Sequence, residues 1–91
     1  MADLNIPNRD EQHGGIEAVG QISQNLKGCI RAGCNWHRLT PAQREALDMM
    51  MHKVAWILSG DSQLRDHWLD AAGYPLCIAR MMEESSDEGV E

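Results

Sequence analysis

Apolar residues recur at steps of three and four over most of the chain, which is the spacing of one face of an α-helix. The first such run ends before Gly33, and its apolar members are Ile16, Val19, Ile22, Leu26 and Ile30. No segment alternates between apolar and polar residues with a period of two. The sequence therefore predicts a first helix that begins near residue 16, and it predicts no strand.

The clearest start signal in the chain lies before the second run. Thr40 offers an N-cap hydroxyl, Pro41 suits the first helical position, and Gln43 lies where it can complete a capping box. The apolar positions that follow are Leu47, Met50, Met51, Val54, Ile57 and Leu58. A long helix is expected from Pro41 to about Ser59, with Gly60 as its stop.

A third run extends from about residue 65 to Met82. Its apolar members are Trp68, Leu69, Ala71, Ala72, Leu76, Ile78 and Met81. Pro75 falls inside the run, where it removes one backbone hydrogen bond. The helix is expected to kink or to split near this proline.

These elements predict an all-α fold of three main helices in a small bundle, formed by residues 15–82. Residues 1–14 lack apolar periodicity and are expected to form a flexible arm, and residues 83–91 are expected to be a disordered acidic tail. A packed part of this size gives one core only modest stability. Self-association, most simply as a dimer, is therefore expected.

The charge of the chain is concentrated at one end. The net charge is −6, and five of the fourteen acidic residues lie within residues 83–91, so the remainder is nearly neutral. Clustered Lys and Arg, which direct nucleic-acid binding requires, are not evident. Three cysteines at unfamiliar spacing indicate reduced thiols. With no apolar run of membrane-spanning length and no signal peptide, the expected location is the cytoplasm of the cell, away from the membrane.

Two carboxylates lie one helical turn apart in the segment DHWLDAAGY, which begins at Asp66. Asp66 and Asp70 could share a Mg²⁺ ion and present it to a phosphate. The alternative is structural, because an acid in the first turn of a helix favours the helix dipole and a second acid can be solvated or paired with a base. Mg²⁺ is thus a candidate cofactor, and spacing alone leaves both interpretations open.

A second polar line lies on the long helix, where Glu45, Asp48 and His52 follow one another at steps of three and four. A carboxylate near the imidazole could raise the pKa of His52 and form an acid–base pair. Lys53 could meet a phosphate as a point charge, or its stem could cover apolar neighbours. No HExxH or similar motif is present, so a solvated helix face is the simpler interpretation.

Large apolar and aromatic residues suggest an interaction surface. Three successive methionines cover more than one helix face, and methionine adapts to varied partners. The indoles are expected to pack with one edge wet, since Trp rarely fits completely into a small core. The candidate surface residues are Met49, Met50, Trp56 and Tyr74.

The chain resembles a family of short phage and prophage proteins of unassigned function. Their pattern is an HG dipeptide, LK, a Trp before the long helix, REALDM, HK.AR.L.G and D.W.D.AGY. The matching positions cover about three quarters of the chain: His13-Gly14, Leu26-Lys27, Trp36, Arg44 to Met49, His52-Lys53, Ala55, Leu58, Gly60, Asp66, Trp68, Asp70 and Ala72 to Tyr74. The chain departs from the pattern at Gly15, Val19 and Trp56.

The helical layout of that family is similar to the all-α nucleoside triphosphate pyrophosphohydrolases of the MazG type. This resemblance implies Mg²⁺ held by helical carboxylates against a triphosphate. The paired EExxE motif of those enzymes is missing here, and only Glu45-x-x-Asp48 approaches it. Architecture alone does not establish an activity, so an enzyme is uncertain and weak or absent catalysis is expected.

Two functions from different classes follow. In the first, a phage accessory protein binds a nucleotide or another phosphorylated ligand through His52, Lys53, Trp68 and Asp70, with Asp66 and Asp70 as possible Mg²⁺ ligands. In the second, a small acidic inhibitor or adaptor binds a host protein, for instance one of antiviral defence, without catalysis. A purely structural role for the DHWLDAAGY residues is a third possibility.

Overall fold

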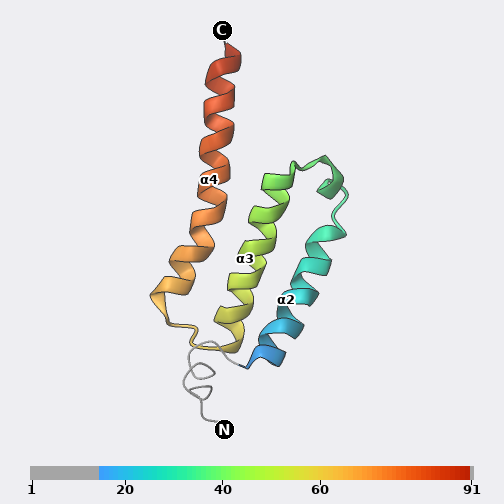
Figure 1. Cartoon of the computed structure of the whole chain (residues 1–91), viewed down its shortest axis with the longest axis vertical. Coiled ribbons are helices and arrows are strands. Elements are labelled where there is room, and N and C mark those ends of the chain that lie inside the picture. Colours follow the sequence, from blue (N-terminus) through green and yellow to red (C-terminus); the bar gives the residue numbers. More distant parts are fainter. Residues whose placement is uncertain (1–14, 91) are drawn as a thin grey trace.

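The computed structural model describes residues 15–90, with side chains for residues 15–85. It contains helix α2 (Ile16–Arg31), a 3₁₀ turn η1 (Trp36–Arg38), helix α3 (Pro41–Ser59) and helix α4 (Arg65–Val90). The three long helices lie side by side, with α3 between α2 and α4 (Figure 1). The predicted all-α bundle of three helices is confirmed. The predicted arm, residues 1–14, lies outside the described residues.

The start of α3 forms as its sequence predicts. The Thr40 hydroxyl oxygen accepts a hydrogen bond from the Gln43 backbone N–H at 3.1 Å, and the Thr40 N–H donates to Gln43 Oε1 at 2.9 Å. Pro41 occupies the first turn, and Gly60 caps the other end. A reciprocal capping box satisfies two backbone groups that a helix end otherwise leaves unpaired. This local chemistry fixes where α3 begins.

Helix α4 shows one of the two outcomes predicted at Pro75 and departs from the prediction beyond Met82. It is continuous through Pro75 and is not split there, although its lower turns lean more than its upper turns in Figure 1. It also continues to Val90, so the backbone of the segment expected to be a disordered tail is helical. Between Met82 and Gly89 no Gly or Pro interrupts the helix, and Glu83 and Glu84 are good helix formers. Despite the length of α4, no helix in the described part of the chain is long and apolar enough to cross a membrane.

The core is thin. The buried apolar residues are Val19, Ala46, Ala55 and Ile57, and Ser23 and His67 are buried with them. Several positions of the predicted apolar faces lie at the surface instead: Ile16, Leu58, Trp68, Leu69, Leu76 and Met81. Since α3 is covered on two sides while α2 and α4 each pack mainly against α3, α3 supplies three of the four buried apolar residues, and large residues of the outer helices remain uncovered.

Candidate functional site

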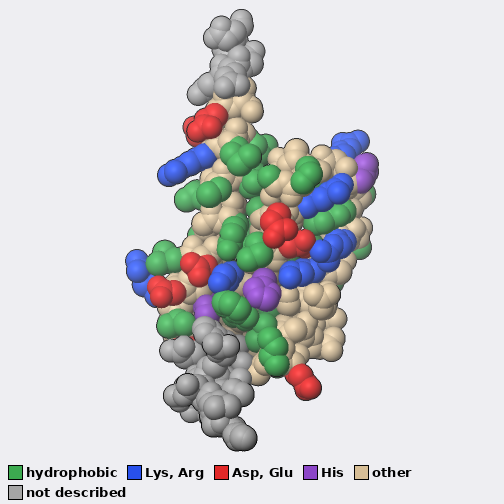
Figure 2. All heavy atoms as spheres, in the orientation of Figure 1, with side chains coloured by type: hydrophobic (Ala, Val, Ile, Leu, Met, Phe, Trp, Pro, Cys, Tyr) green, Lys and Arg blue, Asp and Glu red, His purple; other side chains and the backbone are tan. Residues whose placement is uncertain are grey.

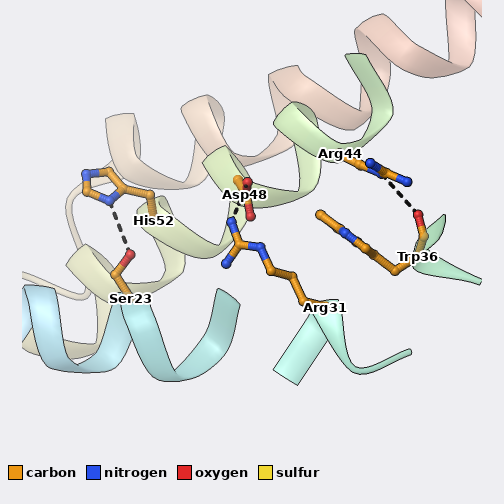
Figure 3. Close-up of polar contacts among 6 residues, drawn as sticks. All are labelled: Ser23, Arg31, Trp36, Arg44, Asp48 and His52. Carbon is orange, nitrogen blue, oxygen red and sulfur yellow. Dashed lines mark hydrogen bonds and ion pairs between the residues drawn. The ribbon is translucent and has the colours of Figure 1, made fainter. Parts of the chain in front are cut away.

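A polar and aromatic cluster occupies the middle of the bundle, where α2 and α4 meet α3 from opposite sides. On the α2 side, the Ser23 hydroxyl lies 3.4 Å from Nδ1 of His52, and Ser23 is only 2% exposed (Figure 3). Burial lowers the pKa of His52 below its ordinary value of 6.5, and the nearby charges of Lys27 and Lys53 lower it further. His52 is therefore held in its neutral form at neutral pH.

On the α4 side, Lys53 makes one contact within its own helix α3 and one with α4. Its Nζ atom lies 4.0 Å from the ring centroid of Trp56, one turn away on α3, and 3.3 Å from Oδ2 of Asp70 on α4. The Lys53 side chain is only 12% exposed, whereas the Asp70 side chain is about half exposed. The cation–π contact and the ion pair together hold the ammonium group against the α3–α4 seam.

Three aromatic rings connect the two sides of the cluster. The ring centroids of His52 and Trp56 are 4.9 Å apart, and those of Trp56 and His67 are 5.5 Å apart, with both pairs tilted. Such tilted arrangements are favourable for aromatic rings. The Trp56 indole thus joins an imidazole of α3 to an imidazole of α4.

Sequence reasoning missed His67, which is only 3% exposed and lies at the α4 end of this cluster. A signal existed, because His67, Ala71, Tyr74 and Ile78 follow one another at steps of three and four along α4. This line forms the inner face of α4, and all four residues are buried or half-buried. A polar residue within an apolar line can therefore be a core residue.

The predicted magnesium ligands are not assembled into a closed site. Asp70 pairs with Lys53 at 3.3 Å, and both Asp66 and Asp70 are exposed. In the described part of the chain, no group of three or more His, Cys, Asp or Glu side chains is arranged to hold a metal ion. The geometry therefore gives Asp70 a lysine partner, and the Mg²⁺ interpretation gains no further ligand from the fold.

The predicted line of Glu45, Asp48 and His52 does not act as one unit. Oδ2 of Asp48 accepts a hydrogen bond from the guanidinium of Arg31 at 3.0 Å, while His52 faces Ser23 (Figure 3). The acid–base pair of Asp48 with His52 is therefore replaced by two contacts to α2. Glu45 is exposed at the surface of α3 and joins neither contact.

A second basic and aromatic group lies where α2, η1 and α3 meet. The guanidinium carbons of Arg31 and Arg44 lie 5.6 and 5.5 Å from the ring of Trp36. Nε of Arg44 also donates a hydrogen bond to the Trp36 carbonyl at 3.1 Å. Figure 2 shows basic side chains gathered on this side of the molecule. These contacts fix the connector between α2 and α3.

Between the start of α3 and the second half of α4 runs an apolar groove. It has two adjoining hollows of about 270 and 430 Å³, which share Gln43, Ile78 and Met82. The smaller hollow is also lined by Leu39, Ala46, Leu47, Met50 and Pro75, and the larger by Thr40, Met81 and Ser85. Hydrophobic side chains are visible along α4 and beside it in Figure 2. Methionine, which adapts to varied partners, contributes three of the lining residues.

The predicted interaction surface is dispersed over the molecule. Met50 lines the groove, Met49 and Tyr74 are half-buried, and Trp56 belongs to the central cluster. Trp68, predicted to contact a ligand, is exposed, and its Nε1 donates to the Ser62 carbonyl at 2.8 Å. Of the predicted ligand-binding residues, the fold brings together His52, Lys53 and Asp70.

Comparison with known proteins returns no relative for this chain. No protein-family model matches it, and neither a curated protein nor a solved structure matches it.

Proposed function

We propose that this protein is a non-catalytic binding protein that docks a basic, amphipathic segment of a partner protein in the groove between α3 and α4. The observation that supports this proposal is the composition of the groove. Its smaller hollow is lined almost entirely by apolar side chains, although it opens to solvent between two helices. Apolar surface of this kind gains free energy when a partner covers it.

Charge at the end of the groove indicates the chemistry of the partner. Glu84, an exposed residue of α4, lies two residues after Met82. An apolar groove with a carboxylate beyond its end is complementary to a helix with apolar residues on one face and Lys or Arg beside them. A host protein is the proposed source of that helix, in line with the resemblance to phage proteins.

The test uses a fluorescently labelled amphipathic peptide built from Leu and Lys at helical spacing. Met82 lines both hollows, and Met82→Glu is expected to weaken peptide binding at least about tenfold, roughly 1.4 kcal/mol. Affinity for the wild-type protein should also fall as salt rises, because Glu84 contributes through a screened charge.

The matched control is Leu58→Glu. It places the same charge on an exposed apolar residue that lies on α3, outside the groove lining. This variant should bind the peptide as the wild type does. Absence of binding to the wild type, or equal loss in the two variants, would contradict the proposal.

A second candidate, favoured by a different observation, is a phosphate-bearing ligand such as a nucleotide. The charges of Lys27 and Lys53 both lower the pKa of His52, so one ammonium group of α2 and one of α3 lie near this imidazole. An anion at this point would relieve the repulsion between these groups. Lys53 would first have to leave Asp70, with which it now pairs. The groove is therefore the better supported site.

A further inference from the structure

The face of α4 that points away from α3 carries an apolar stripe with charged ends. We name it the outer stripe of α4; its residues, at steps of three and four, are Arg65, Asp66, Leu69, Ala72, Gly73, Leu76, Arg80 and Glu83. All of them are exposed, with Leu69 at 49% and Leu76 at 58%. The stripe is distinct from the groove, whose lining does not include any of these residues.

The corresponding face of α2 shows that exposure alone does not produce such a stripe. Both α2 and α4 are outer helices of the bundle (Figure 1). The exposed side of α2 carries mainly polar residues, among them Glu17, Gln21, Gln24 and Asn25. An outer helix that faces water on one side is expected to be polar there. The leucines of α4 therefore indicate that something covers this face.

We infer that a second copy of this chain covers the outer stripe, with the two α4 helices antiparallel and crossing at Gly73. The order of charges along the stripe supports this occupant. Arg65 and Asp66 lie at one end, and Arg80 and Glu83 lie at the other. None of the four has an ion-pair partner among the described residues.

A two-fold axis near Gly73 pairs each charge with its opposite. Reversal of one helix about Gly73 places Asp66 against Arg80 of the second copy, and Arg65 within two positions of Glu83 of the second copy. A parallel arrangement would place Arg80 against Arg80. The antiparallel register also brings Leu76 against Leu69 and Ala72 of the second copy. The interface is thus self-complementary, as a two-fold dimer requires.

Gly73 fits the position at the crossing. A glycine inside a helix is destabilising relative to alanine, and a Cβ at Gly73 would meet nothing within 4 Å in this chain. Without a side chain, the backbones of two crossing helices can approach closely. The thin core of the single chain also leaves stability to be gained by covering the leucines.

The first experiment is sedimentation equilibrium of the full chain and of charge variants. The wild type is expected to dimerise. Arg80→Glu and Asp66→Arg are each expected to weaken dimerisation at least about tenfold, since each places like charges opposite one another. An equimolar mixture of the two variants should recover much of the affinity, because a pair of opposite charges forms again where the two substituted positions meet. Asp61→Arg, at an exposed residue off the stripe, is the control and should dimerise normally.

The second experiment separates the interface from helix stability. Gly73→Ala is expected to raise helix content yet weaken dimerisation. Gly28→Ala is the matched control, since Gly28 is an exposed helical glycine of α2 with equally open surroundings. It should raise helix content and leave dimerisation unchanged. A wild type that stays monomeric, or a mixture of charge variants that fails to recover affinity, would overturn the inference.

Discussion

Two polar residues of α3, Asp48 and His52, find their partners on α2 and not in each other. Asp48 and His52 are one turn apart on α3, yet Asp48 binds Arg31 and His52 faces Ser23. Side chains one turn apart on a helix attract each other only weakly. A cation or hydroxyl supplied by the adjacent helix can meet the same group at shorter distance. Helical spacing predicted which residues share a face, but it did not predict their partners.

His52 makes the stability of the fold dependent on pH. Its pKa is lowered in the folded chain, so the unfolded chain binds more protons between the folded pKa and the ordinary value of 6.5. Stability should therefore be full above about pH 7 and should fall as the pH drops through that window. His52→Gln is expected to reduce this loss, measured by urea denaturation between about pH 7.5 and pH 5.

The control for this pH measurement is His37→Gln, which removes an exposed imidazole of η1. It should leave the pH profile close to that of the wild type. A profile for His52→Gln as steep as that of the wild type would show that other groups cause the acid sensitivity.

At the level of elements, local signals were sufficient where a few adjacent residues control the outcome. The capping box at Thr40, the stop at Gly60 and the continuous periodicity of α3 all appear as predicted. The apolar pattern indicated an end of α4 near Met82, whereas the helix continues to Val90. Helix propensity in residues 83–88 does not depend on apolar content, so α4 continues.

Removal of the cap should be measurable in the stability of the whole chain. Thr40→Ala deletes the acceptor for the Gln43 N–H and is expected to cost about 1 kcal/mol. For a domain of this size, that corresponds to a decrease of roughly 4–8 °C in Tm, measured by circular dichroism. Thr40→Ser keeps a hydroxyl at the cap and should lose much less. Equal Tm values for the alanine and serine variants would argue against the role of the cap.

At the level of the whole molecule, the bundle leaves two apolar surfaces uncovered on opposite sides of α4. The inner face of α4 carries His67 and Ile78 toward α3 and continues into the groove, whereas the outer stripe carries Leu69 and Leu76. One copy of the chain cannot bury both. A dimer through the outer stripe would leave the groove open for a partner protein, so the two proposed interactions are compatible.

Dimerisation should couple the stability of the fold to protein concentration. The Tm of the wild type is expected to rise by a few degrees over about a hundredfold increase in concentration, because association favours the folded state by mass action. The Tm of Arg80→Glu should change much less over the same range. Differential scanning calorimetry at several concentrations measures both. Identical concentration dependence in the two proteins would count against the interface on the outer stripe.

The sequence by itself determined the number of long helices and both ends of α3, since periodicity, the Thr40 cap and Gly60 act within a few residues of one another. It also identified residues of the central cluster, because His52, Lys53 and Asp70 stood out as polar groups on helix faces. Only the tertiary structure decided that Lys53 pairs with Asp70, that His67 is buried, and that Leu76 is exposed. Burial and pairing depend on which helix packs against each face. Helix α4 carries apolar residues on two faces, so its sequence does not determine which of the two packs against α3.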